Sequence, residues 1–174
     1  PLARRYRVHL RRVASIRKLL QEFCRRRPRV ILVNGWSELL PKQLIASATG
    51  GCVGTHPSLL PKNRGHAPIA WHFLNEERYG GVTIFYLDEG CDSGPIIDAA
   101  KFHIGPNDNA SSYYVKISVL GAKLLVKHYD AIVAGTTRAR PQDHRRATFL
   151  LKRRPQDSSL EFSQPRKRLR HGRL

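Results

Sequence analysis

Residues 81–87, Gly-Val-Thr-Ile-Phe-Tyr-Leu, limit the possible folds of this chain more than any other feature. The run lacks the alternation of apolar and polar residues that marks a strand with one solvated face. A strand made from it has two faces that must be kept from water. The run therefore predicts a strand inside a sheet that is covered on both sides.

Segments with strand and helix patterns alternate along the rest of the chain. Short apolar and β-branched runs predict strands over residues 8–10, 29–33, 52–55 and 95–104. Apolar residues at helical spacing, together with proline and glycine at the ends, predict helices over residues 14–26, 41–48, 68–75 and 110–134. Asn109 is a suitable N-cap for the last helix, and Gly135 is a suitable end. This alternation predicts an α/β fold.

The chain carries a formal net charge of +18, and the excess lies at its two ends. Residues 1–30 hold eleven Lys and Arg against one acid, and residues 140–174 hold eleven against three. Residues 31–139 hold nine of each and are formally neutral. Basic runs at chain ends are usually solvated faces or tails, so nucleic acid is an alternative partner that this distribution does not favour.

The composition also bears on compartment and domain organisation. No apolar stretch approaches the roughly 20 residues that a membrane span requires, so we expect no membrane partner. The three cysteines are odd in number and lack metal-ligand spacing, so we expect reduced thiols, no metal site and a cytoplasmic protein. The 174 residues suit one domain, expected over residues 1–150. Residues 151–174 are expected to form a basic tail, disordered over 163–174.

Two loops carry the residues with chemical potential. Residues 56–65 read His-Pro-Ser-Leu-Leu-Pro-Lys-Asn-Arg-Gly, and Asp92-Ser93-Gly94 begins 27 residues after Gly65. The first loop is stiffened by prolines and presents an imidazole, and the second follows the apolar run and presents a carboxylate. Such a pair can exchange protons with a substrate, which favours an enzyme.

These loops resemble those of the formyltransferases that use 10-formyltetrahydrofolate. The matching residues are Gly35-Trp36-Ser37, the loop 56–65, Gly81-Val82-Thr83 and the segment 87–97, within a resemblance that covers about residues 8–162. The family implies a Rossmann-like three-layer sandwich whose catalytic domain would span residues 1–150. Its first two strands have no counterpart after Pro1, so we expect a partial sheet.

The resemblance implies a role for each loop. Formyl transfer to an amine passes through a tetrahedral intermediate that carries an oxyanion and an ammonium proton. His56 would stabilise the negative charge on the formyl oxygen, and Asp92 would take the proton, directly or through a water. Taken from the residues alone, His56 could equally be a structural loop histidine and Asp92 a turn residue.

The resemblance also implies how the substrates bind. The donor, 10-formyltetrahydrofolate, would bind between the loops of residues 36–40 and 87–91, with expected contacts from Trp36, Leu39, Leu40, Leu87, Asp88 and Gly90. Ser58 and Arg64 would contact the acceptor, although a structural salt bridge is an equal alternative for Arg64. The expected acceptor is a small primary amine such as an amino sugar.

Three alternatives stay open beside that acceptor. They are a formyltetrahydrofolate hydrolase, an RNA-binding enzyme like methionyl-tRNA formyltransferase, and an inactive fragment. The sequence also departs from the family at position 54, where Gly54 replaces the usual asparagine two residues before His56. Asn34, Thr55 and Asn63 are candidates to replace the lost amide. The oligomeric state is not indicated by the sequence.

Overall fold

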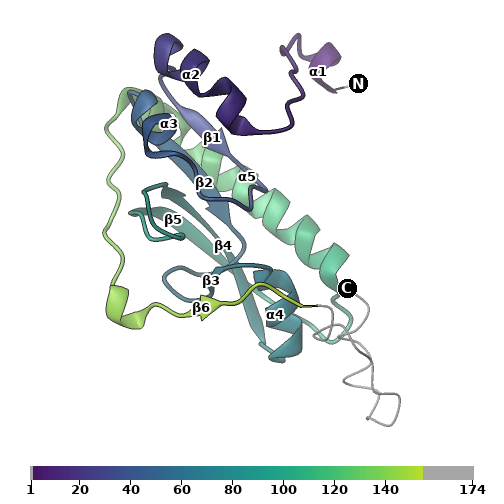
Figure 1. The fold of residues 1–174 in the computed structure, drawn as a ribbon. Coiled ribbons are helices and arrows are strands. Elements are labelled where there is room, and N and C mark those ends of the chain that lie inside the picture. Colours follow the sequence, from purple (N-terminus) through teal and green to yellow (C-terminus); the bar gives the residue numbers. More distant parts are fainter. Residues whose placement is uncertain (1, 155–174) are drawn as a thin grey trace.

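The computed structural model describes residues 2–154 and is built around a four-stranded mixed sheet (Figure 1). The strand order is β1 (Ile31–Val33), β2 (Cys52–His56), β4 (Tyr79–Tyr86) and β5 (Ile96–His103). β1 and β2 are parallel, whereas β2 with β4 and β4 with β5 are antiparallel. The prediction of an α/β fold is confirmed.

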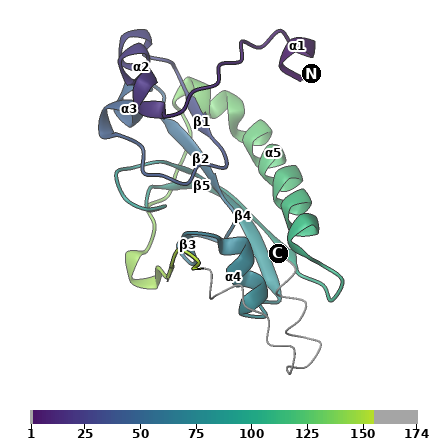
Figure 2. The same cartoon turned by 45° about the vertical axis from the view of Figure 1, so that its right-hand side comes forward.

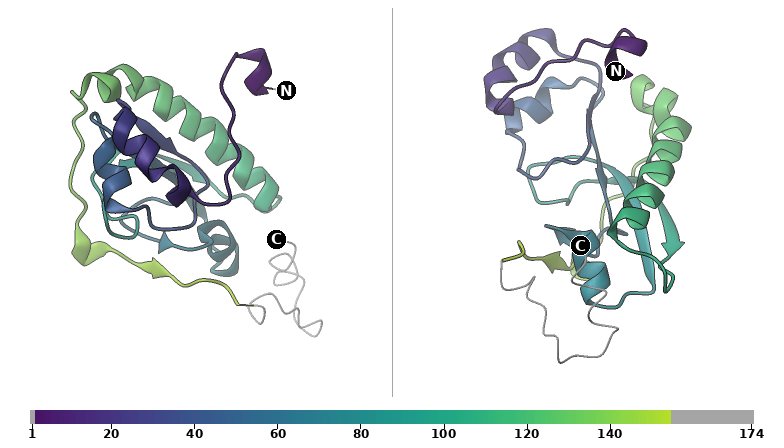
Figure 3. Two further views of the ribbon diagram at one scale, coloured as in Figure 1. Left: turned by 45° about the horizontal axis from the view of Figure 1, so that its top comes forward. Right: turned by 90° about the vertical axis from the view of Figure 1, so that its right-hand side faces the viewer.

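The helix α5 (Ala110–Ala134) crosses one face of this sheet, and Figure 3 shows α2 and α3 on the other side. The main core lies under α5, where Val82 and Ile84 of β4 pack with Leu124 and Ile132 of the helix. Phe85 points to the opposite face and packs with Leu60 and Ile96. β4 is therefore buried on both faces, as the unbroken apolar run at residues 81–87 predicts.

The N-terminal elements differ in part from the prediction. The chain begins with α1 (Leu2–Arg5), and a 3-10 turn, η1 (Ile16–Leu19), leads into α2 (Leu20–Arg26) instead of one helix from residue 14. Ser15 caps this turn through its side chain. The predicted strand at residues 8–10 is wrong. Val8 and Leu10 are exposed and pair with no other strand among the described residues.

The helix α5 follows its local signals. Asn109 caps it, with a reciprocal bond between its backbone and Ser112, and Gly135 ends it in the left-handed conformation. The first turn presents Tyr113, whose ring packs against His72 and Phe73 of α4 (Pro68–Leu74) and whose hydroxyl donates to the carbonyl of Pro57. This contact anchors the start of the loop 57–65.

The chain after α5 returns to the sheet as a segment that we call the strap, residues 139–151 (Figures 1 and 2). Arg140 exchanges two backbone hydrogen bonds with Ile96 at the start of β5. After the turn η2 (His144–Arg146), the strap forms β6 (Phe149–Leu150), which pairs in parallel with β3 (Arg64–Gly65). The predicted loop thus ends in a short strand, because the strap supplies its partner.

Two further expectations concern the C-terminal tail and membrane-spanning helices. The predicted disordered tail at residues 163–174 lies outside them, as does most of the basic tail 151–174. Between residues 2 and 154, no helix has the length and apolar character needed to cross a membrane. The remaining helix, α3 (Lys42–Ser47), begins one residue after Pro41, close to its predicted start.

Candidate active site

His56 and Asp92, predicted as the catalytic pair, lie side by side. His56 is the last residue of β2, and Asp92 belongs to the loop between β4 and β5. The imidazole Nδ1 is 3.4 Å from the carboxylate Oδ2. The His56 side chain is 7% exposed and that of Asp92 is 21% exposed. The antiparallel pairing of β2 with β4 places His56 opposite Thr83 and Val53 opposite Tyr86. The loop after Tyr86 therefore folds back along β2 to bring Asp92 beside His56.

The surroundings of His56 determine which ring nitrogen can change its protonation. Nε2 lies 2.7 Å from the backbone carbonyl oxygen of Asn63. A carbonyl only accepts hydrogen bonds, so Nε2 carries the hydrogen and Nδ1 is the basic atom beside Asp92. Burial lowers the pKa of His56, and His72 acts in the same direction, while Asp92 and the Asn63 carbonyl oppose them. The resting imidazole is therefore neutral near pH 7.

The Asp92 loop is held in an uncommon conformation. Asp92 has φ +50, in the left-handed region that costs a non-glycine residue free energy. Its Oδ2 accepts a hydrogen bond of 2.8 Å from the backbone N–H of Gly65, which turns the carboxylate toward His56. Gly94 permits the turn, because a Cβ there would lie 1.9 Å from the carbonyl oxygen of Tyr86.

Both residues open into a cavity of about 1070 Å³ at the carboxyl ends of β1 and β2. All six residues predicted to bind the donor line it: Trp36, Leu39, Leu40, Leu87, Asp88 and Gly90. Trp36 and Leu39 are exposed at 44% and 63%, so their apolar surfaces are available to a ligand. Across the opening, Lys42 forms an ion pair of 2.6 Å with Glu89, which links α3 to the loop that precedes Asp92.

Ser58 and Arg64, predicted to bind the acceptor, do not line this cavity. The Ser58 hydroxyl is fully buried and donates to the carbonyl of Lys62, so it shapes the loop. The Arg64 guanidinium is also buried and donates two hydrogen bonds to the side-chain oxygen of Gln142. These contacts support a structural role for both residues, and the partner of Arg64 is an amide instead of the acid considered from sequence.

The space beside Gly54 is already occupied. A Cβ at this position would lie 3.0 Å from Leu87 Cδ2 and 3.4 Å from the Phe85 ring. Among the candidate replacements for the amide, Asn34 and Thr55 line the cavity and are joined by a hydrogen bond of 2.6 Å from the Thr55 hydroxyl. Asn63 is committed elsewhere, because its amide donates to Glu77 and its carbonyl faces His56.

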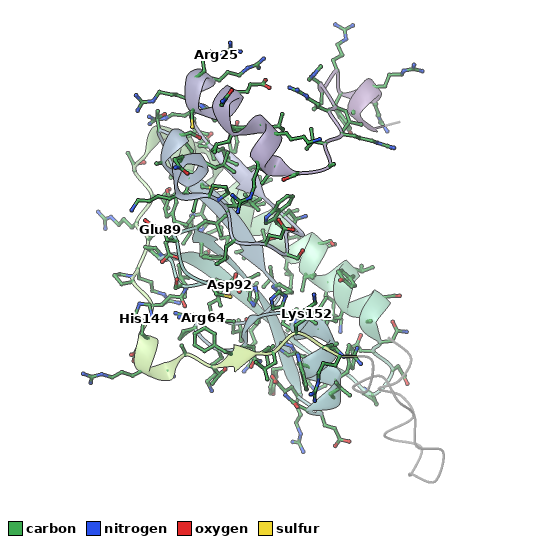
Figure 4. All side chains as sticks on the ribbon, viewed as in Figure 1. Arg25, Arg64, Glu89, Asp92, His144 and Lys152 are labelled. Atoms are coloured by element: carbon green, nitrogen blue, oxygen red, sulfur yellow. The ribbon has the colours of Figure 1, made fainter. Side chains whose placement is uncertain are left out.

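The structure adds contacts that the sequence did not indicate. Asn63 contributes its backbone carbonyl, Gly65 its N–H, and Gln142 of the strap bonds to the backbone of the Asp92 loop. Figure 4 shows Arg64 and Asp92 near His144 of the strap. No local pattern marks Gln142, because its partners lie 48 to 78 positions away along the chain.

The arrangement can move a proton within an apolar cavity. Nδ1 of His56 can gain a proton, and the adjacent carboxylate stabilises the resulting cation. Asp92 can itself receive a proton from a ligand in the cavity. Between residues 2 and 154, no three His, Cys, Asp or Glu side chains are grouped as a metal ion would require.

Comparison with known families decides where the chain belongs. Residues 5–129 match the model of the formyl transferase family. The chain belongs to the formyl transferase family. Methionyl-tRNA formyltransferase from Kosmotoga olearia is 40% identical to this chain over 134 residues, which are 77% of the chain and 43% of the relative. The chain spans less than half the length of the curated relatives it matches.

Solved structures share the fold of this member of the family. The Mycobacterium tuberculosis protein Rv3404c superposes with a TM-score of 0.76 at 24% identity, over 98% of this chain and 79% of that one. The formyltransferase PseJ from Anoxybacillus kamchatkensis superposes with a TM-score of 0.63 at 27% identity, over 70% of this chain and 64% of PseJ. Its structure contains tetrahydrofolate and a formamido sugar nucleotide. The predicted formyltransferase-type fold is confirmed.

Proposed function

We propose that this formyl transferase moves a formyl group from 10-formyltetrahydrofolate to a primary amine. The observation that carries the proposal is the contact of His56 Nδ1 with the Asp92 carboxylate at the wall of a large, largely apolar cavity. Membership of the family and the tetrahydrofolate present in PseJ support the same reaction class.

The residues around the cavity fit a folate. A pterin ring binds through apolar walls and a few polar groups, most of them backbone. Trp36, Leu39 and Leu87 supply apolar walls, and the loop of Asp88 and Gly90 also lines the cavity. The Asp88 carboxylate fixes that loop by accepting from the Gly90 N–H and the Ser93 hydroxyl. The bound folate would supply the formyl carbon next to His56.

The chemistry requires one proton transfer that the pair can perform. The acceptor nitrogen bonds to the formyl carbon, the bond from that carbon to N10 breaks, and the proton lost by the amine is finally taken up by N10. Asp92 takes the proton from the acceptor nitrogen. Since Nδ1 of the neutral His56 lies 3.4 Å from Asp92 Oδ2, it can receive this proton from Asp92, while the Nε2 hydrogen stays with Asn63. The resulting imidazolium stabilises the negative charge on the formyl oxygen until the proton passes to N10.

Two classes of acceptor have support, and an amino sugar is our first candidate. The Gly-Trp-Ser motif and the formamido sugar nucleotide bound to PseJ favour a sugar amine. Methionyl-tRNA is the second candidate, because the relatives at 38–40% identity are named methionyl-tRNA formyltransferase. The basic ends of the chain suit an RNA, although they lie outside the residues that form the cavity.

The first experiment is a calorimetric titration with 5-formyltetrahydrofolate. We expect binding to the wild-type chain and weaker binding after Trp36→Ala. Asp92→Asn should also bind 5-formyltetrahydrofolate more weakly. Its matched control is Asp130→Asn, which changes an exposed carboxylate on α5 and should bind as the wild type does. Absence of binding by a folded sample would refute the proposal.

The second experiment measures transfer with an amino sugar nucleotide, with methionyl-tRNA and with no acceptor. We expect formylated amine from one acceptor, with a rate at least about tenfold lower in both His56→Asn and Asp92→Asn. Formate release that is equal with and without acceptor would identify a hydrolase. Bound folate without any turnover would identify an inactive relative.

A further inference from the structure

Gln142 of the strap has its polar side chain fully bonded in the interior. It is 6% exposed, and it lies outside the cavity wall. Its Oε1 accepts from Nε and Nη2 of Arg64 at 3.1 and 2.6 Å. Its Nε2 donates to the carbonyl oxygens of Asp92 and Gly94 at 2.9 and 2.7 Å. The amide thus uses two acceptor and two donor positions.

The chemistry of the partners fixes the orientation of this amide. An arginine side chain only donates hydrogen bonds, and backbone carbonyls only accept them. The oxygen of Gln142 must therefore face Arg64, and its nitrogen must face Asp92 and Gly94. Glutamate has the same length but would present a second oxygen to the two carbonyls, so it cannot replace the amide.

The two carbonyls that Gln142 binds belong to the residues that set the position of the catalytic carboxylate. Asp92 is left-handed, and Gly94 passes against the carbonyl of Tyr86. A left-handed aspartate has a higher backbone energy than an extended one, so the surrounding bonds must hold it. Gln142 bonds to the backbone at Asp92, whereas Gly65 bonds to its carboxylate.

The same short segment carries both of these contacts. Arg64 holds Gln142, and the next residue, Gly65, donates its N–H to Asp92. β6 pairs with this segment, and a Cβ on Gly65 would lie 2.6 Å from the carbonyl oxygen of Leu150. The strap thus closes around the loop that also supplies the Asn63 carbonyl to His56. Gln142 thus contacts the Asp92 loop without lining the cavity.

We propose that Gln142 is a positioning residue that holds the Asp92 carboxylate beside His56 by fixing the backbone of Asp92 and Gly94 against Arg64. The residue acts through Asp92 and does not contact substrate. For its effect on rate, this inference rests on the proposed function. Its effect on the geometry of the pair does not, and can be measured without any substrate.

The test compares Gln142→Met and Gln142→Glu in the full chain with the wild type. Methionine keeps the length of the side chain and removes all four hydrogen bonds. Glutamate keeps the bonds to Arg64 and repels the carbonyls of Asp92 and Gly94. Gln21→Glu, on the exposed face of α2, is the matched control for the change in charge.

The deciding readout is the pKa of His56, measured by NMR on a sample with labelled histidine and assigned with His56→Asn. The Asp92 carboxylate raises this pKa against the effect of burial. If Gln142 positions the carboxylate, Gln142→Met lowers the pKa of His56 while the control leaves it unchanged. Gln142→Glu lowers it less than Gln142→Met does, because the charge of the new carboxylate favours the protonated imidazole. An unchanged pKa of His56 in folded Gln142→Met would overturn the inference. This outcome does not depend on whether the chain acts on a folate.

Kinetics supply the second readout if the chain transfers formyl groups. We expect kcat to fall by about 10- to 100-fold in both variants, since misplacement of a catalytic group by about 1 Å has effects of this size. The KM for the folate should change by less than about threefold, because Gln142 does not line the cavity. A rise in KM at constant kcat would contradict a positioning role. Loss of the native fold in both variants would also overturn the inference, since the residue would then be structural.

Discussion

Next to His56 on the same face of β2 lies Gly54, and Leu87 fills the space that a side chain at this position would need. The Cβ contact of 3.0 Å with Leu87 Cδ2 is tight, but the neighbour is the end of a side chain and can move. Gly54 and Leu87 therefore form a matched pair. The usual family asparagine would not fit here without a change at Leu87.

This match predicts how substitutions at the two positions combine. Gly54→Asn alone should lower the free energy of unfolding by about 1–3 kcal/mol, because it overpacks the site. Leu87→Ala should make room, so the double variant should be more stable than the sum of the single changes by at least about 1 kcal/mol. Urea unfolding of the four proteins measures this coupling. Additive effects would show that Leu87 does not limit the site.

His56 affects the stability of the fold as well as the proposed proton transfer. Its pKa is lowered in the folded state by burial, below the 6.5 that an ordinary histidine has. The unfolded chain then binds more protons than the folded chain below about pH 6.5, so stability is present at higher pH and is lost as pH falls. The contribution of His56 changes by up to about 1.4 kcal/mol per pH unit.

We therefore expect the wild type to lose more stability between pH 8 and pH 5 than His56→Gln does. The measurement is urea unfolding at both pH values, with His9→Gln as the control at an exposed histidine. If His56→Gln shows the same loss as the wild type, burial does not keep His56 neutral.

At the scale of elements, Asp98 connects β5 to α5. Its Oδ2 lies 2.8 Å from both Lys127 Nζ and His128 Nε2. Partial burial opposes ionisation of Asp98, but the hydrogen bonds from Lys127 and His128 outweigh it and lower the pKa of Asp98 to about 2. A carboxyl whose pKa falls on folding stabilises the protein above its unfolded pKa of 3.8 and loses this effect as pH falls toward 2.

Asp98→Asn should therefore destabilise the chain at pH 7 and have less effect at pH 3. Lys127 is 65% exposed, so solvent screening reduces the expected loss at pH 7 to about 1 kcal/mol. Unfolding of the variant and of Asp130→Asn, an exposed carboxylate on α5 near Lys127 in sequence, measures the difference. A loss that is equal at both pH values would assign it to packing and not to charge.

The elements also show why part of the fold could be predicted from sequence. α5 was predicted with its bounds, because its apolar spacing, the Asn109 cap and the Gly135 end are all local. A strand also needs a partner. Val8 and Leu10 have the composition of a strand but pair with no strand between residues 2 and 154. Arg64 and Gly65 form a strand because the distant strap pairs with them.

The same distinction applies to the site. The proximity of His56 to Asp92 was expected from a family resemblance carried by contiguous motifs, and the geometry agrees with it. The bonds of Gln142 depend on how three segments meet in space, so no spacing in the sequence indicates them. Arg64 was assigned from its charge, which does not reveal that the side chain is buried.

At the scale of the whole molecule, the excess charge is separated from the cavity. Residues 31–139 are formally neutral and include the residues that line the cavity. The excess of basic residues lies in the two ends. Binding to a polyanion through the ends should therefore be independent of folate binding. Attraction of this kind weakens steeply with salt, because binding releases counterions from the nucleic acid.

The tail offers a direct test, because five of its basic residues lie between positions 163 and 174. The variant changes all five to glutamine: Arg166, Lys167, Arg168, Arg170 and Arg173. Its affinity for a single-stranded RNA should depend less on salt, with a slope reduced by about 0.7 for each lost phosphate contact. Fluorescence anisotropy over a series of salt concentrations measures the slope, and calorimetry should show unchanged affinity for 5-formyltetrahydrofolate. As a control, exchanging Arg and Lys at the same positions keeps the charge and should preserve the wild-type salt dependence. An unchanged salt dependence in the glutamine variant would show that the tail does not contact the RNA.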